Sequence, residues 1–238
     1  MILFSHWIAT LRDANVKKPT LKPSCVLLLG DNKRLNKQAI RLVRRYLRVK
    51  KVVYFYKQGI TEARVAALKP DYVLNFLSDK VLKGALLKFK NVNFHPAPPE
   101  WPGRGSASMA LFNADKTYGA TAHVMEPNVD SGAILLVKRF PISADQLCED
   151  VFRQGKEACL VLLERVLRHI RKYGSLPPQI PEKWRGKPCN KRDFQKWLIL
   201  NPGNKREFIS KIKASKHSIF PGPYLIVHGY KFGLLKGQ

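Results

Sequence analysis

Short apolar runs alternate with amphipathic segments along the first hundred residues, and this alternation limits the folds open to the chain. The segments 36–48, 61–70 and 80–89 have the apolar spacing of helices. The runs that predict strands are CVLLLGD (25–31), KVVYFY (51–56), DYVLNFLS (71–78) and NVNFH (91–95). Strands that alternate with helices pair in parallel. We therefore expect an α/β fold with a Rossmann-like, mostly parallel sheet flanked by helices, and with ligands at the carboxyl ends of its strands.

The next segment of the chain predicts a β-hairpin followed by a long helix. TYGATAHVM (117–125) and AILLVKRFPI (133–142) are the two strand candidates, separated by a PNVDSG turn. The helix is predicted to begin at the capping signature Ser143-x-x-Gln146 and to end at Gly174, after a cationic last turn.

The C-terminal residues predict a small appendage. A proline-rich connector, SLPPQIPEKWRGKP, covers 175–188. A short helix is predicted near 203–215, and two strand-like pieces, YLIVHG and YKFGLL, meet at His228-Gly229. So short a tail buries little core alone, so we expect it to pack on the main domain or on a dimer partner. The predicted organisation is a core over 1–174, a connector over 175–188 and an appendage of one helix plus a β-hairpin over 189–238.

The chain is strongly basic, with 43 lysines and arginines against 17 acidic residues and a net charge of +26. Seven positive charges and no negative one lie between Lys37 and Lys51, and a second concentration covers 183–213. The first cluster fits the solvated face of a helix whose apolar stripe is Ile40, Val43 and Leu47. The excess charge also suits an anionic partner. Nucleic acid is the obvious candidate on charge alone, but a phosphorylated small substrate, an anionic membrane surface or simple colloidal solubility fits as well, and nucleic acid is not the favoured partner overall.

Other sequence features exclude several classes of protein. The four cysteines have no C-x-x-C spacing and no histidine grid, which favours a reducing, cytoplasmic setting without a metal site. No apolar run reaches the roughly 18 residues of a membrane span, and the first 18 residues lack a secretory cleavage pattern. The first strand is followed by LGDNKRLN, which is neither a dinucleotide fingerprint nor a P-loop.

Three polar residues suggest acyl transfer to an amine. Asn93 and His95 lie two positions apart at a strand end, so they share one face, and Asp130 follows in a VDSG turn. The Asn93 amide would stabilise an oxyanion, His95 would hydrogen-bond that oxygen or exchange a proton, and Asp130 would orient the imidazole or accept the proton of the amine. This chemistry requires no serine or cysteine nucleophile. Taken singly, His95 also fits a structural hydrogen-bonding role and Asp130 a turn residue.

The run from Asn93 to Gly132 resembles the formyltransferase family, whose members use N10-formyltetrahydrofolate. The matching motifs are Asn93-Phe94-His95-Pro96, the loop APPEWPGRG, the strand YGATAHVM and the turn Asp130-Ser131-Gly132, in that order. The resemblance covers roughly 24–142 and implies that Asn93, His95 and Asp130 form the catalytic group. It places the pterin of the folate against Phe76, Leu77, Ser78, Val81 and Leu82, and the acceptor against a loop containing Pro98, Trp101, Arg104 and Gly105.

Within that family, the compact tail and the form NFHPAPPE are most similar to the sugar N-formyltransferases. This similarity implies a nucleotide-linked 4-amino-4,6-dideoxyhexose as acceptor, a role in lipopolysaccharide O-antigen biosynthesis and a homodimer. Only 64 residues follow Gly174, fewer than the C-terminal barrel of methionyl-tRNA enzymes would need. Methionyl-tRNA, glycinamide ribonucleotide or another amine remain alternative acceptors, and a non-catalytic polyanion-binding protein on the same fold is a further alternative.

Overall fold

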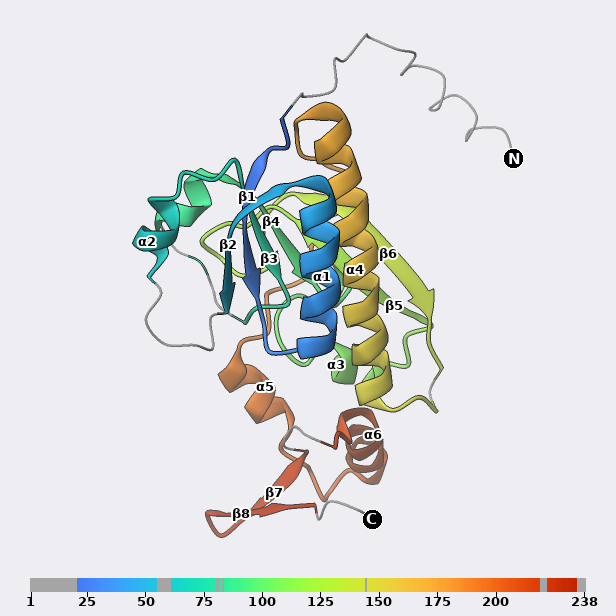
Figure 1. The fold of residues 1–238 in the computed structure, drawn as a ribbon. Coiled ribbons are helices and arrows are strands. Elements are labelled where there is room, and N and C mark those ends of the chain that lie inside the picture. The colour runs from blue at the N-terminus through green and yellow to red at the C-terminus, as the bar shows by residue number, and fades with distance from the viewer. Residues whose placement is uncertain are drawn as a thin grey trace, which may run out of the picture.

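The computed structural model describes residues 21–54, 61–79, 82, 84–143, 145–218 and 222–234. Its centre is a six-stranded sheet in the order β2-β1-β3-β4-β5-β6 (Figure 1). The first four of these strands pair in parallel and the last two join antiparallel, which confirms the Rossmann-like, mostly parallel sheet. The strands are β1 (Ser24–Leu29), β2 (Arg48–Tyr54), β3 (Tyr72–Phe76), β4 (Lys90–His95), β5 (Thr117–His123) and β6 (Ile134–Pro141).

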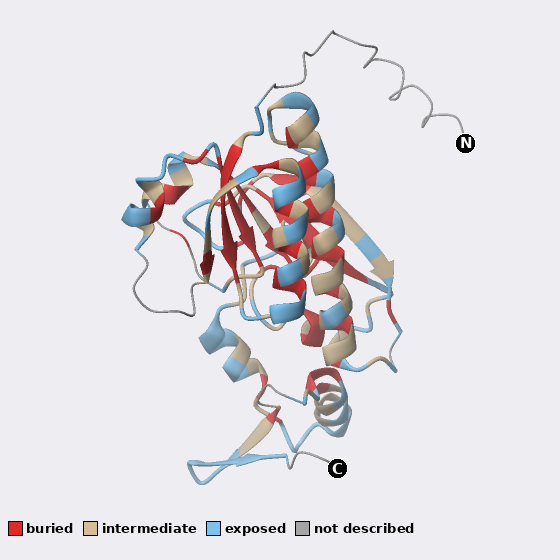
Figure 2. Ribbon diagram, in the orientation of Figure 1, coloured by how far each residue is buried: buried red, intermediate tan, exposed pale blue. Residues whose placement is uncertain are grey.

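Helices cover both faces of this sheet. The described helices are α1 (Lys33–Tyr46), α2 (Glu62–Ala66), the 3-10 helix η1 (Gly84–Lys88), α3 (Ser106–Phe112), α4 (Cys148–Tyr173), α5 (Lys191–Trp197) and α6 (Lys205–Ser215). Helices α1 and α4 lie side by side over one face, and α2 and η1 lie on the other (Figure 1). The strands between them are the most buried part of the molecule (Figure 2). No helix within the described ranges is long and apolar enough to cross a lipid bilayer.

The basic stretch after β1 forms an amphipathic helix, but α1 covers Lys33–Tyr46 and not the predicted 36–48, so the cations from Arg48 onward lie on β2. Val43 and Leu47 are buried against the sheet, whereas Arg41 and Arg44 are exposed. Asn32 caps the helix by accepting a hydrogen bond from the backbone N–H of Leu35 at 3.0 Å. The positive charge of α1 therefore lies on its solvent side.

The long helix α4 ends as expected but begins differently. Gly174 closes it in the left-handed conformation, with a φ of 69°. The predicted cap at Ser143 is wrong, because the helix begins at Cys148 and no side chain caps it. Instead, the Ser143 N–H donates to the side-chain oxygen of Gln146, so these two residues close a separate turn before the helix.

Other predicted boundaries also shift. The helix predicted over 61–70 is α2, which covers Glu62–Ala66. Within the described part of the 80–89 segment, the helical turn is η1, a 3-10 helix that begins at Gly84, where φ is 64°. Strand β2 begins at Arg48, three residues before the predicted start at Lys51, and positions 55–56 lie outside the described residues.

The C-terminal residues form the predicted helix and hairpin, together with the short helix α5, which was not predicted. Strands β7 (Tyr224–Val227) and β8 (Tyr230–Gly233) pair antiparallel. Positive φ angles of 48° at His228 and 81° at Gly229 make their turn. The hairpin projects away from the sheet and is largely exposed (Figures 1 and 2).

Candidate active site

The carboxyl end of β4 brings together the residues that the sequence singled out. His95 ends this strand and is buried, with 8% of its surface exposed, and Asn93 lies two residues earlier on the same face. The loop between β5 and β6 places Asp130 beside them, with its Oδ2 3.3 Å from His95 Nδ1. The backbone of Asp130 has a φ of 44°, a conformation in which Asp is more readily tolerated than most residues.

A second histidine, His123, completes this cluster. Its Nε2 lies 3.0 Å from Asn93 Nδ2 and 3.3 Å from Asp130 Oδ1. Its Nδ1 faces the carbonyl oxygen of Val124 at 2.8 Å, so Nδ1 carries a hydrogen and Nε2 of the neutral ring accepts from Asn93. Sequence reasoning treated His123 only as part of a strand. The available signal was the hairpin itself, because antiparallel pairing sets His123 opposite Asn93.

The neighbouring strand fixes the orientation of the Asn93 amide. Asn75 on β3 donates from Nδ2 to Asn93 Oδ1 at 2.9 Å, because the parallel register places these two residues side by side. With its oxygen engaged, Asn93 directs its NH₂ group toward His123. An NH₂ group has two hydrogens, and within the described residues only one of them has a partner. The second is available to an oxygen atom of a ligand.

Asp130 is an ionised carboxylate held by several donors. Burial raises its pKa, but the electrostatic interaction with His95, the largest of the lowering causes, and nearby hydrogen-bond donors together lower it by more. The backbone N–H of Gly103, which donates to Oδ2 at 2.8 Å, adds to this lowering. The pKa of Asp130 therefore lies well below its usual range, so this side chain is better suited to orienting His95 than to storing a proton.

A segment of the C-terminal connector covers both histidines. We name Ile180–Cys189 the strap, and its Trp184 donates from Nε1 to the carbonyl of Gly132 at 2.8 Å. The indole meets the ring of His123 edge-on at a centroid distance of 4.8 Å and that of His95 at 5.9 Å. No sequence pattern indicates this role, because Trp184 stands in a proline-rich run without periodicity.

Backbone hydrogen bonds tie the strap to the loop after β4. The N–H of Arg185 donates to Pro99 O at 2.9 Å, and that of Cys189 donates to Pro102 O at 3.1 Å. Arg139 on β6 adds an ion-pair bridge, with its Nη2 2.9 Å from Glu100 and 2.7 Å from Glu182 of the strap. The loop and the strap therefore form one connected wall beside the cluster.

The four residues expected to touch the acceptor have different surroundings. Pro98 is buried and accepts the N–H of Trp101 in a turn, and the indole of Trp101 donates to Asp115 at 2.6 Å. The Trp101 carbonyl lies 3.2 Å from His95 Nε2. Gly105 has a φ of 73° and starts α3. These three residues build the loop.

Only the side chain of Arg104, among these four, is exposed and directed outward. Half of it is accessible to solvent, and its Nη2 lies 3.3 Å from Asp79 in the turn after β3. Arg104 therefore connects the loop after β4 with the region expected to hold the folate.

The residues expected to hold the pterin also divide into two sets. Phe76 and Leu82 are buried in the core, so their side chains support the turn after β3 from below. Leu77 and Ser78 are half-buried at the turn itself, and Leu77 has a φ of 55°. Val81 lies outside the described residues. At this turn, a flat ring would meet the aliphatic side chain of Leu77 and the backbone polar groups beside it. This combination fits a pterin.

Burial makes the cysteine thiols of the described residues weak nucleophiles. Burial raises the pKa of Cys25 to about 12 and also raises the pKa values of Cys148, Cys159 and, less deeply buried, Cys189. In the part of the chain that the structure describes, no three His, Cys, Asp or Glu side chains are arranged to hold a metal ion.

The cluster lies within the part of the chain that matches a known family. The model of the formyl transferase family matches residues 34–167, more than half of the chain. The chain belongs to the formyl transferase family. The match covers Asn93, His95 and Asp130, and it also covers His123.

Curated relatives of the family differ in their acceptors. A methionyl-tRNA formyltransferase of Campylobacter curvus is 32% identical over 74% of this chain and 57% of its own length. A GDP-perosamine N-formyltransferase of Brucella melitensis is 27% identical over 48% of this chain and 43% of its own. The chain thus spans about half or less of the length of the curated relatives it matches.

Solved structures share the fold over nearly the whole chain. A sugar N-formyltransferase from Shewanella superposes with a TM-score of 0.72 at 22% identity, covering 89% of this chain and 96% of that one. An N-formyltransferase from Helicobacter canadensis, in complex with folinic acid and dTDP-3-aminofucose, has a TM-score of 0.66 at 16% identity, covering 89% and 86%. At these identities, the likeness is one of fold.

Proposed function

We propose that this protein transfers the formyl group of N10-formyltetrahydrofolate to the primary amine of a nucleotide-linked amino sugar, with a 4-amino-4,6-dideoxyhexose as the favoured acceptor. The observation that carries this proposal is the connected cluster of Asn93, His123, Asp130 and His95 at the carboxyl end of β4, within the family match. The carboxyl ends of parallel strands are where open α/β sheets bind ligands.

In the proposed reaction, the amine attacks the formyl carbon and tetrahydrofolate leaves. Asn93 donates its second N–H to the formyl oxygen as negative charge develops there. His95 takes the proton that the attacking amine loses and returns it to N10 of tetrahydrofolate as the bond between N10 and the formyl carbon breaks. Asp130 orients His95 and complements the positive charge that the ring gains. The amide of Asn93 is held by Asn75 and His123 before substrate arrives, so little reorganisation is needed in the transition state.

The folate would lie against the turn after β3. Leu77 and Ser78 would contact the pterin, Phe76 and Leu82 would support that turn from the core, and Val81 is proposed as a further contact. The acceptor would approach from the loop after β4, where Arg104 would pair with its diphosphate and Trp101, Pro98 and Gly105 would set the shape of the loop.

Two features support a sugar rather than a tRNA acceptor. The structures that superpose over nearly their whole length include sugar N-formyltransferases, and one such relative was crystallised with a nucleotide-linked amino sugar. Methionyl-tRNA is the second candidate. The Campylobacter methionyl-tRNA formyltransferase matches 74% of this chain, whereas the Brucella GDP-perosamine enzyme matches 48%. The net charge of +26 also suits a nucleic acid. Within the proposed organisation, 1–174 forms the catalytic core, 175–188 connects it, and 189–238 forms the appendage.

We also propose a homodimer formed through the β7–β8 hairpin. Tyr230 and Phe232 on β8 are 72% and 54% exposed, and Ile226 on β7 is 52% exposed. A two-stranded hairpin with this much apolar surface is marginal alone and is stabilised when a second copy covers it.

The test is an acceptor panel with purified protein and N10-formyltetrahydrofolate. It contains GDP- and dTDP-linked 3- and 4-amino sugars, methionyl-tRNA and glycinamide ribonucleotide, with tetrahydrofolate release and product mass as readouts. We expect release that depends on an amino sugar. Release only with methionyl-tRNA would select the second candidate, and no release with any amine would reject formyl transfer.

Substitutions at the cluster test the roles of its residues. We expect Asn93→Ala, His95→Asn and Asp130→Ala each to lower kcat by at least 100-fold, the scale of losing one group that stabilises or protonates the transition state. His169→Asn, near the end of α4 and outside both the cluster and the proposed hairpin interface, is the matched control for His95→Asn and should retain full activity. A His95→Asn enzyme with normal kcat would refute the proposed mechanism.

A further inference from the structure

The amino ends of the parallel strands carry positive side chains that the proposed chemistry does not use. Parallel pairing sets Ser24 beside Arg48 and Tyr72 beside Lys90, so these strand starts form one edge of the sheet. From Arg48 to Lys90 this edge spans three strand spacings, about 14 Å. We name its cations the amino-edge row, whose members are Lys22, Arg44, Arg48, Lys50, Lys69 and Lys90. The row lies at the opposite end of the strands from the catalytic cluster (Figure 1).

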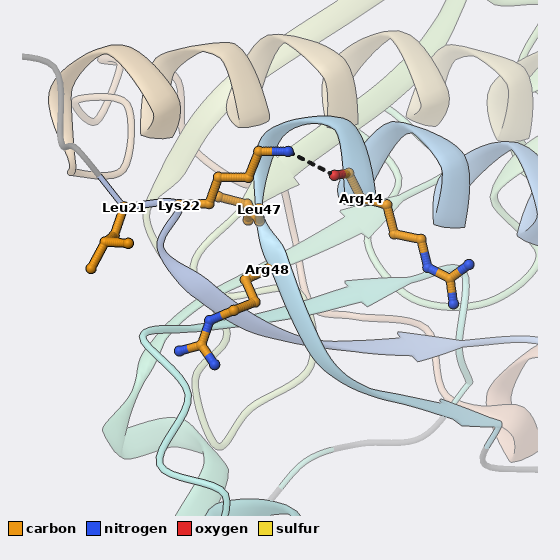
Figure 3. Close-up of a pocket in the computed structure, with 5 residues that line it drawn as sticks. All are labelled: Leu21, Lys22, Arg44, Leu47 and Arg48. Carbon is orange, nitrogen blue, oxygen red and sulfur yellow. Dashed lines mark hydrogen bonds between the residues drawn. The ribbon is translucent and has the colours of Figure 1, made fainter.

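One end of the row surrounds a pocket of about 450 Å³. Its lining consists of Lys22, Arg44 and Arg48 together with Leu21 and Leu47, and it includes no acidic side chain. In Figure 3, Lys22 is turned toward the backbone carbonyl of Arg44, and the guanidinium groups of Arg44 and Arg48 point to opposite sides of Leu47. The cationic groups are therefore spread out, which suits successive phosphates of a chain better than a single one, and the leucines offer apolar contact to a sugar or base.

Backbone carbonyls accept hydrogen bonds from three of the four lysines of the row. Lys22 donates to Arg44 O at 3.3 Å, and Lys50 donates to the carbonyls of Leu68 and Lys69 at 2.6 and 2.8 Å. Lys90 donates to Gly174 O at 3.4 Å. An ammonium group has three hydrogens, so each of these lysines retains a donor for an anion.

Acidic side chains do not neutralise the row. Among the described residues, no carboxylate forms an ion pair with any of its six members. Asp71 is a carboxylate near the row, and its Oδ2 accepts the N–H and hydroxyl of Ser24 at 2.7 and 2.6 Å. These hydrogen bonds, followed by the charges of Lys50 and Arg48, lower the pKa of Asp71. One carboxylate that is engaged elsewhere therefore faces six cations.

We propose that the amino-edge row binds the phosphodiester backbone of a nucleic acid, at a surface separate from the catalytic crevice. A line of cations about 14 Å long matches a chain of several phosphates better than a single phosphorylated metabolite. The pocket favours nucleic acid over a lipid bilayer, because a planar membrane does not enter a concavity between side chains, whereas a phosphate and its sugar do.

The test measures anisotropy of a fluorescein-labelled 20-nucleotide oligo(U) RNA with the full chain between 50 and 300 mM KCl. If all six cations contact phosphates, log Kobs falls with log salt with a slope of about −4. The double variant Arg44→Gln and Arg48→Gln removes two contacts. It should reduce the slope by about 1.4 and weaken binding about 25-fold at 0.1 M salt. The double variant Lys191→Gln and Arg192→Gln on α5 makes the same charge change far from the row and should bind like the unchanged protein.

Three results would overturn the proposal. Equal weakening by both double variants would mean diffuse attraction to a basic protein, and no binding at 50 mM salt would mean that the row is only a solvated surface. The third is binding to vesicles with 30% phosphatidylserine that depends on Arg44 and Arg48 while the RNA does not bind. Circular dichroism of each variant verifies folding. Formyl transfer is expected to be unchanged in both, so loss of RNA binding and loss of catalysis are read separately.

Discussion

Replacing Trp184 tests whether the strap maintains the catalytic cluster. In Trp184→Phe a ring remains, but the hydrogen bond to Gly132 O is lost, at a cost of about 1 kcal/mol. Removing a fully buried tryptophan costs about 3–5 kcal/mol. Because Trp184 is only half-buried, we expect Trp184→Ala to lower the free energy of unfolding by about 2 kcal/mol. Without the indole, water reaches His95 and His123, so hydrolysis of the formyl donor should rise relative to transfer.

Three measurements check this prediction: urea unfolding, the ratio of hydrolysis to transfer, and the proton NMR shifts of the two imidazole rings. The edge-on indole lies 4.8 Å from His123, so its loss should move the His123 Hε1 signal more than that of His95 at 5.9 Å. Trp197→Ala is the matched control, since Trp197 stacks on Phe194 and touches neither histidine. Unchanged histidine shifts in Trp184→Ala would refute the reasoning, whether or not the protein proves to be an active formyltransferase.

Other predictions concern acid stability, glycine packing and association. The lowered pKa of Asp130 contributes stability that is present above its ordinary value of 3.8 and is lost as the pH falls below it. Urea midpoints of the wild type and Asp130→Asn should therefore converge between pH 5 and pH 2, and a constant difference would contradict this. Gly30→Ala places a Cβ 2.0 Å from the carbonyl oxygen of Leu77 and should cost on the order of 2 kcal/mol in urea unfolding; an unchanged midpoint would argue against the close approach. The double variant Tyr230→Glu and Phe232→Glu should be monomeric in sedimentation at concentrations where the wild type is a dimer, and a persisting dimer would exclude the hairpin interface.

Much of the sheet follows from local patterns, because a short apolar run between turn residues has few other stable conformations. The proximity of His95 and Asp130 was also predictable. The Asn-x-His-Pro segment, the proline-rich loop and the Asp-x-Gly turn follow one another in the order found in the formyltransferase family. The role of His123 was not, because it depends on the antiparallel register that sets it opposite Asn93. The start of α4 was mispredicted at Ser143, because the same capping residues also close an isolated turn. Trp184 lies in an aperiodic connector, where only long-range hydrogen bonds determine position.

The strap has a consequence for how this chain can be divided. Cutting the chain after Gly174 removes the indole that covers two histidines and the N–H groups that hold the carbonyls of Pro99 and Pro102. A fragment ending there keeps every strand of the large sheet, yet leaves its polar cluster without one of its walls. The strap and the loop after β4 both form walls of the cluster. Substitutions in the strap are therefore expected to lower turnover as strongly as substitutions in that loop.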